Sequence, residues 1–170
     1  NYGSTVVQRD QILRMALMSD AFTCPSEFIR KRASQEGISS HYITDSIDFR
    51  HFKNEKTKDS FNKESLKAIW SGQSVKANEL NEILPLLRER NISLIVISEK
   101  KPKLSDSFEY ILWSYNTFPK TILKGDFCIA PRQTNNSYDL GHSHYKIGVF
   151  LACGIPALAP PLPSYLEVIG

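Results

Sequence analysis

The sequence predicts an α/β fold in which a Rossmann-like parallel sheet carries helices on both faces, preceded by a β-α-β piece of a second domain. Two observations support this prediction. Short apolar runs alternate with helical patterns along most of the chain, an order typical of parallel sheets with crossover helices. The run at 92–98, ISLIVIS, is apolar and rich in β-branched residues, as a central strand buried on both faces should be.

The first part of the chain contains a helix followed by a β-α-β unit. A helix, a strand, a second helix and a second strand are expected at 6–18, 21–24, 27–36 and 40–44. Apolar residues at helical spacing indicate the first helix: Val7, Ile12, Met15 and Leu17. Ser26 can cap the second helix, and Gly37 can end it, because glycine readily takes the left-handed conformation that follows a helix.

The second part of the chain repeats this alternation. Strands are expected at 67–71, 92–98, 109–114, 126–130 and 156–159, with helices between them at 77–90, 116–123 and 144–153. An apolar stripe indicates the longest helix: Leu80, Ile83, Leu84 and Leu87. Pro85 lies inside that helix and predicts a kink or a late helix start, since proline removes a backbone hydrogen bond. Ser164 and Glu167 form a predicted capping box that opens a last helix.

The chain has 170 residues, of which 41% are hydrophobic and 23% charged, a composition typical of globular proteins. We expect three parts: a β-α-β piece at 1–49, a charged linker at 50–66 and the parallel-sheet domain at 67–170. The linker is indicated by a dense group of charged residues, which favours an uncollapsed segment. The chain opens with Asn1 and stops where a helix has just begun, so we expect it to be a piece of a longer protein.

Charge and cysteine usage exclude several classes of partner. The formal net charge of +3 is small and the basic residues are spread along the chain, so no nucleic-acid partner is expected. No apolar run reaches the roughly 18 residues of a membrane span. Cys24, Cys128 and Cys153 lie in apolar surroundings without C-x-x-C spacing, which predicts free, buried thiols and a cytoplasmic location. Peripheral contact with the inner face of the membrane stays open.

Candidate sites follow from the predicted sheet, because ligands of such sheets bind beyond the carboxyl ends of the strands. Those ends lie on the loops after Trp70, Ser98, Trp113 and Pro131. The last of these loops leads to GHSHYK at 141–146, just where an apolar helix is expected to start, near Ser143. Unpaired amides and a partial positive charge at a helix N-terminus attract phosphate.

Two histidines and a lysine at this helix start, His142, His144 and Lys146, therefore suit a diphosphate. The alternative is that all three are solvated surface side chains. A metal site built on His-x-His is disfavoured, since no Cys or Glu stands near with ligand spacing, and no metal is expected.

The loop SGQSVK at 71–76 is a second candidate for phosphate contact, with Gly72 beside the backbone and Lys76 as a point charge. It matches neither a Walker loop nor G-x-G-x-x-G, which argues against P-loop NTPases and dinucleotide binding. Asp45, Asp48 and Asp139 are more typical of turns and caps than of catalytic carboxylates.

The ordering of these segments resembles that of the two-Rossmann (GT-B) glycosyltransferases over nearly the whole chain. The stretch 19–52 resembles the last β-α-β unit and crossover of their acceptor domain. The stretches 67–98 and 123–132 resemble strands and a helix of their donor domain. The most specific match is KIGVFLACGIPALAPPLPSYLEVI at 146–169. The resemblance implies that 1–49 ends an acceptor-side domain and that 67–170 is a nucleotide-sugar-binding donor domain, truncated at its end.

The candidate donor-binding residues are Ser71, Gly72, Lys76, Trp113, Ser114, His142, Ser143, His144 and Lys146. Lys146 matches the basic residue that the family often places eight positions before the glycine of ACG, where it would contact the donor diphosphate. The family holds the nucleobase near the positions of Trp113 and Ser114. One departure is clear: many retaining members have a Glu at the position of Val149 to hold the ribose.

The leading hypothesis is a metal-independent, hexosyltransferase-like enzyme without a cofactor. It would transfer a sugar from a nucleotide-sugar to a glycan or lipid-linked acceptor, in polysaccharide or glycoconjugate synthesis. The sequence names no catalytic base. Two alternatives stay open: a sugar-nucleotide epimerase, and a non-catalytic binding or scaffolding domain of the same fold, which Val149 supports.

Overall fold

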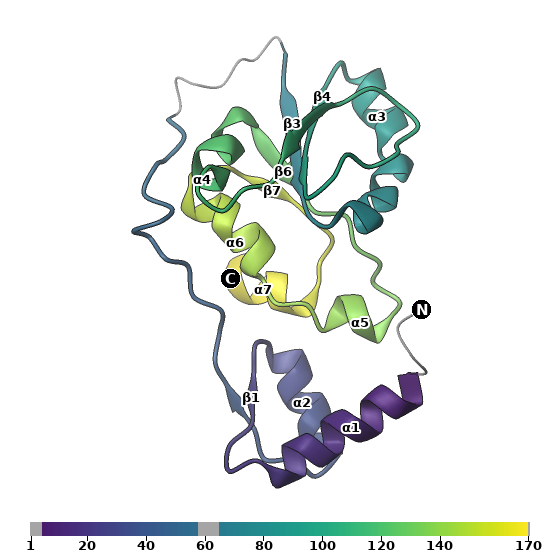
Figure 1. The fold of residues 1–170 in the computed structure, drawn as a ribbon, viewed down its shortest axis with the longest axis vertical. Helices are drawn as coiled ribbons and strands as arrows, with labels where there is room; N and C mark the ends of the chain where they lie inside the picture. The colour runs from purple at the N-terminus through teal and green to yellow at the C-terminus, as the bar shows by residue number, and fades with distance from the viewer. Residues whose placement is uncertain (1–4, 58–64, 170) are drawn as a thin grey trace. The chain divides into compact units, whose positions relative to one another are not determined.

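The computed structural model describes residues 5–57 and 65–169 (Figure 1). These residues divide into two compact units. Unit 1 takes in the chain up to Asp45, the stretch Asn135–His144 and the chain from Leu162 onward. Unit 2 takes in Ser46–Thr134 and Tyr145–Pro161. The chain therefore passes between the units more than once.

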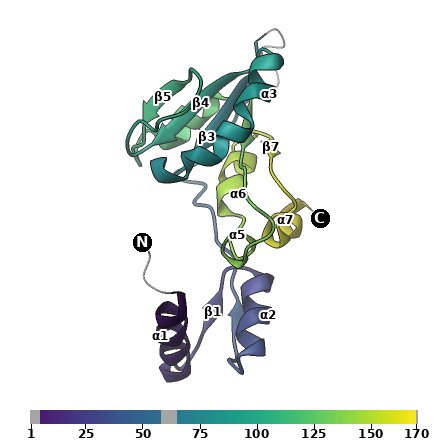
Figure 2. The same ribbon diagram turned by 90° about the vertical axis from the view of Figure 1, so that its right-hand side faces the viewer.

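Unit 2 is built on a five-stranded sheet whose strand order is β5-β4-β3-β6-β7. Figure 2 shows β5, β4 and β3 side by side. The strands are β3 (Lys67–Ser71), β4 (Ser93–Ser98), β5 (Glu109–Leu112), β6 (Phe127–Ile129) and β7 (Ala157–Leu158). All neighbouring pairs are parallel. The predicted α/β fold with a parallel sheet is confirmed, and each expected strand has a counterpart within a few residues.

Helices cover both faces of this sheet because successive side chains of a strand point to opposite faces. They are η2 (Ser74–Glu82), α3 (Leu84–Glu89), α4 (Phe118–Thr121), η3 (Ile122–Lys124) and α6 (Tyr145–Ala152). On one face Trp70 packs in a cluster with Leu80 and Leu84. On the other, a Cβ on Gly125 would lie only 2.3 Å from a side-chain carbon of Ile69, so the turn after η3 sits directly on the sheet.

The expected helix at 77–90 is divided in two. A 3-10 stretch, η2, comes first, and α3 begins at Leu84 with Pro85 in its first turn. Proline is tolerated there, since first-turn amides have no partner within the helix. The late helix start predicted from Pro85 is confirmed.

The strand order reverses at β3. The chain runs outward from β3 to β4 and β5, then returns to place β6 on the other side of β3. Such a reversal opens a crevice at the carboxyl ends of the strands, where parallel α/β sheets bind their ligands.

The connecting segment, residues 46–57, packs with unit 2. Phe52 is buried there, and Lys56 forms an ion pair with Asp126 at 2.8 Å. The compact units therefore do not follow the predicted boundaries of 1–49, 50–66 and 67–170. Part of the predicted linker, residues 58–64, lies outside the described residues.

Unit 1 contains a two-stranded parallel sheet and short helices. Its elements are α1 (Thr5–Met18), β1 (Thr23–Cys24), α2 (Glu27–Gln35), β2 (His41–Tyr42), α5 (Ser137–Leu140) and α7 (Pro163–Ile169). The hydroxyl of Ser26 accepts a hydrogen bond from the amide of Ile29, and Gly37 has a φ of 75°. Both predicted ends of α2 are therefore confirmed.

The predicted capping box is wrong. Ser164 lies inside α7, and its hydroxyl donates to the carbonyl of His142. Glu167 instead accepts a hydrogen bond from the Tyr42 hydroxyl at 2.9 Å. A proline at the first position of α7 starts the helix, because its fixed φ is already helical and its missing amide is not needed there.

Helix α1 forms as predicted, but three of the apolar side chains that indicated it are largely exposed. Ile12, Met15 and Leu17 are 57%, 71% and 72% exposed, whereas Ala16 is buried. The spacing of the apolar residues therefore predicted a helix but not which face of the helix is buried.

All three cysteines are free and buried, as predicted. Burial raises the pKa of the Cys128 thiol to about 12, so it behaves as a small apolar side chain. None of the helices within the described residues is long and apolar enough to cross a bilayer.

Candidate functional site

A pocket of about 350 Å³ opens in unit 2 where the strand order reverses. Strand β3 contributes Trp70 and Ser71 to its wall, and the turn that follows contributes Gly72. Two kinds of side chain dominate the rest of the lining. One is a cationic cluster: Lys76, Arg132 and Lys146. The other is an aromatic cluster: His51, Phe52, Trp113, Tyr115 and Phe118.

Lys146 lies in the first turn of α6, and its Nζ is 4.8 Å from the centre of the Trp70 ring. Burial, and after it the nearby charge of Arg132, lower the pKa of Lys146 to about 8. Glu79 and the Cys128 side chain act in the opposite direction, and Lys76 adds to the lowering. The charged ammonium is thus held in a place that disfavours its charge, which is a common feature of functional sites.

Arg132 follows β6, and its side chain is only 8% exposed. Its Nη1 lies 3.4 Å from both carboxylate oxygens of Glu79. Glu79 offsets part of the charge, and the cluster keeps an excess of positive charge in the pocket.

Gly72 is required by packing. A Cβ at this position would lie 2.7 Å from a ring carbon of Trp70, and Trp70 is itself buried. The Gly72 amide donates to the carbonyl of Ile97 at 3.1 Å. The glycine therefore lets the chain pass over the indole at the mouth of the pocket. The indole N–H of Trp70 is buried and has no hydrogen-bond partner among the described residues.

The aromatic cluster is continuous. The His51 and Tyr115 rings are stacked, with centres 4.0 Å apart and an interplanar angle of 9°. Phe52 meets Phe118 edge to face at 6.1 Å, and Phe118 lies 6.4 Å from Trp113. Tyr115 is 60% exposed and Trp113 46% exposed, so flat aromatic surface is available to a ligand.

Of the nine predicted site residues, five line this pocket: Ser71, Gly72, Lys76, Trp113 and Lys146. Ser114 lies next to the pocket in sequence, and its carbonyl accepts the amide of Phe118 at 2.9 Å, which starts α4. The Trp113 amide donates to the carbonyl of Ser98 at 3.0 Å, which extends the pairing of β4 with β5.

The remaining three predicted residues, His142, Ser143 and His144, belong to unit 1. His144 is only 6% exposed, and its Nε2 lies 3.3 Å from the Thr44 hydroxyl. The Nε2 of His142 lies 3.9 Å from a carboxylate oxygen of Asp139. Helix α6 begins at Tyr145, two residues later than expected, so these three residues precede the helix.

Sequence reasoning missed Arg132, Tyr115 and His51. The loop after Pro131 was identified as a candidate, and an arginine one residue further on was a usable signal. His51 lay in a segment interpreted as linker, where its stacking partner could not be identified from spacing.

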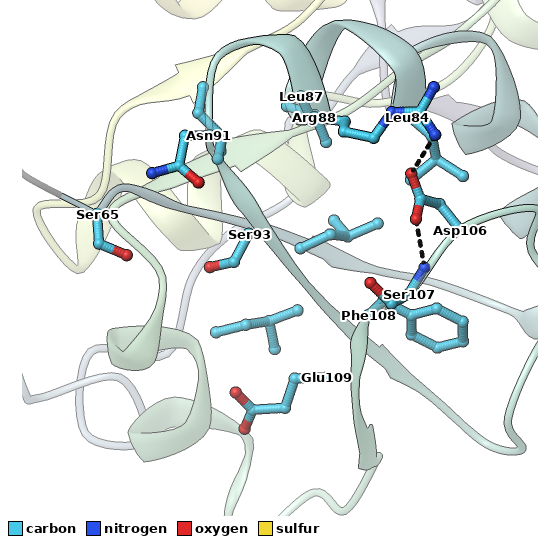
Figure 3. Close-up of a pocket in the computed structure, with 13 residues that line it drawn as sticks. Ser65, Leu84, Leu87, Arg88, Asn91, Ser93, Asp106, Ser107, Phe108 and Glu109 are labelled. Carbon is cyan, nitrogen blue, oxygen red and sulfur yellow. Dashed lines mark hydrogen bonds and ion pairs between the residues drawn. The ribbon is translucent and has the colours of Figure 1, made fainter.

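A second pocket, of about 400 Å³, lies at the amino ends of β4 and β5 (Figure 3). Its arginine, Arg88, is paired with Asp106 at 3.5 Å, and Asp106 also accepts the amide of Ser107 at 2.8 Å (Figure 3). Its charges therefore already have partners, and it lies at the edge opposite to the one that parallel sheets use for ligands. We do not assign a function to it.

Searches with known proteins do not identify the chain: no family model matches it, and no curated protein sequence matches it significantly. Across the described stretches, we find no group of three or more His, Cys, Asp or Glu side chains placed to hold a metal ion.

Proposed function

We propose that unit 2 binds a nucleotide-activated sugar, and that the chain is the donor-binding part of a GT-B glycosyltransferase. The observation that carries the proposal is the combination of a cationic cluster and an aromatic cluster in one pocket, at the point where the strand order reverses. A nucleoside diphosphate has the matching chemistry, because it joins a flat base to several negative charges.

The cationic cluster supports the diphosphate part of this proposal. Lys146 and Arg132 are close enough for the arginine to lower the pKa of the lysine. Their mutual repulsion is relieved when an anion enters between them, and charge-assisted hydrogen bonds to phosphate are among the stronger ones in proteins. Arg132 offers a planar fork that matches phosphate oxygens, whereas Lys76 and Lys146 act as point charges.

In a transfer reaction these groups would act on the leaving group. The bond between the sugar and the phosphate oxygen breaks as the acceptor hydroxyl attacks, and negative charge grows on the diphosphate. Fixed positive charges stabilise that charge as it develops. The residue that takes the acceptor proton is not assigned.

Calorimetric titration with UDP, GDP and dTDP at pH 7 tests the proposal. The wild-type chain is expected to bind at least one of them. Lys146→Ala and Arg132→Ala should each weaken that binding by roughly 1.5–3 kcal/mol, the scale of a charge-assisted hydrogen bond. Lys103→Ala is the matched control, since Lys103 is exposed and lies outside the pocket. Failure of the wild type to bind any of the three, or equal affinity in all four proteins, would contradict the proposal.

A further inference from the structure

The connecting segment, residues 46–57, carries two features that a solvated tether does not need. One is a buried ion pair near its end, and the other is a pair of aromatic rings in the pocket wall. Between them lie only a few residues, so that fixing the first also places the second.

The ion pair is between Lys56 and Asp126, whose side chains are only 5% and 6% exposed. The Lys56 Nζ also donates to the carbonyls of Gly125 at 2.8 Å and Leu123 at 3.3 Å. The second oxygen of Asp126 accepts the amide of Lys67 at 2.8 Å. A buried ion pair persists when its remaining hydrogen-bonding capacity is met in this way. The Lys56 amide adds a bond to the carbonyl of Cys153 at 2.9 Å.

The aromatic rings belong to His51 and Phe52. Asp48 makes the turn that presents them: its carbonyl accepts both of their amides at 2.9 Å, and its side chain accepts the Arg50 amide at 2.9 Å. Phe52 is only 5% exposed, and the His51 ring is stacked on Tyr115.

One hydrogen-bonding atom of His51 is not satisfied by the described residues. Its Nε2 is buried and has no partner among the described residues. Buried polar atoms in proteins are nearly always hydrogen-bonded, and His51 lines the pocket. The ring that lines the pocket therefore carries a polar atom that no described residue satisfies.

We infer that the connecting segment is the wall of the pocket that holds the base of a nucleoside diphosphate. His51 is its ligand-contacting residue, and the Lys56–Asp126 pair is its positioning device. This inference rests on the proposed function. It assigns the base to the aromatic cluster, with Tyr115 and Trp113 offering exposed ring surface, and it leaves the phosphates to the cationic cluster.

The test uses two probes that share a diphosphate and differ in whether it carries a nucleoside: UDP and inorganic pyrophosphate. His51→Ala should weaken UDP binding by about tenfold, the scale of a lost base-stacking contact, and leave pyrophosphate affinity unchanged. Lys56→Met should show the same selective loss of UDP affinity, because it removes the ion pair that positions the connecting segment and leaves the cationic cluster unchanged. Lys53→Met is the matched control: Lys53 is an exposed lysine of the same segment, and its replacement should change neither affinity.

Each outcome separates the inference from the proposed function. Wild-type protein that binds neither pyrophosphate nor any of UDP, GDP and dTDP contradicts the proposed function itself. Wild-type protein that binds UDP, with His51→Ala binding UDP equally well, overturns the inference and leaves the proposed function standing. An equal loss of affinity for both probes in His51→Ala also overturns the inference, since a residue that contacts only the base does not affect the binding of phosphate. Thermal unfolding identifies any variant that does not fold, and His51→Ala decides the matter if Lys56→Met is such a variant.

Discussion

The charge of Lys146 should lower the stability of the folded chain while it contributes to ligand binding. Replacing Lys146 with methionine should therefore raise stability and lower affinity. The pKa of Lys146 falls from 10.5 to about 8 in the folded chain, first because of burial. Each whole step of pKa corresponds to about 1.4 kcal/mol, which sets an upper bound of about 3.5 kcal/mol on the cost of the charge. Because the side chain is not fully buried, we expect about 1–3 kcal/mol after allowance for nearby water.

Methionine keeps the length and apolar stem of the side chain and removes the charge. Lys146→Met should therefore raise the melting temperature at pH 7, by about 2–4 °C for each kcal/mol in a chain of this size. The same variant should bind nucleoside diphosphates more weakly. Gains in stability that cost function are typical of residues retained for a site.

The pH dependence has a definite sign. Below pH 8 the lysine is charged in both the folded and the unfolded chain, and the full cost is present. Between pH 8 and 10.5 the unfolded chain binds more protons than the folded one, so the stability of the wild type rises relative to the variant. The gap in melting temperature should shrink across that window. A variant less stable than the wild type at pH 7, or a gap that stays constant to pH 10, would refute this reasoning.

Three further predictions follow from the site and its supports. Diphosphate affinity should fall as pH rises through 8, because Lys146 then loses the proton that the complex needs; calorimetry at pH 7 and 9 measures this, and equal affinities would count against Lys146 as a phosphate ligand. Gly72→Ala should destabilise unit 2 by about 1–3 kcal/mol, the usual cost of overpacking, because the added carbon meets the buried Trp70 ring; an unchanged denaturation midpoint would mean that the turn can move. Asp126→Ala should destabilise it by about 3–5 kcal/mol, since it leaves the Lys56 charge buried without its partner; a loss below 1 kcal/mol in urea unfolding would show that the ammonium reaches water.

The parallel sheet could be predicted because its strands carry their own evidence. The run at 92–98 is mostly apolar. It forms β4, whose residues are buried from Leu94 to Ser98. The start of α3 at Leu84, with Pro85 in its first turn, followed from the missing proline amide alone. These are local rules, in which the residue and the few around it decide the outcome.

The pocket could be predicted only in part. Lys146 and Gly72 were identified, yet the reason for Gly72 is its closeness to Trp70, a packing fact that spacing does not reveal. His51 was assigned to a charged linker, since its composition is polar; its stacking on Tyr115 joins residues 64 positions apart in the chain. His142 and His144 come just before a helix, which suggested a phosphate site. Both instead make contacts within unit 1: His142 with Asp139, and His144 with Thr44.

The most direct test of the central claim is a crystal structure of the chain with UDP bound. The account predicts the diphosphate between Arg132 and Lys146, with Lys76 beside it, and the base against the aromatic cluster. UDP in the pocket around Arg88 and Asp106, or a pocket at β3 that stays empty at saturating UDP, would contradict it.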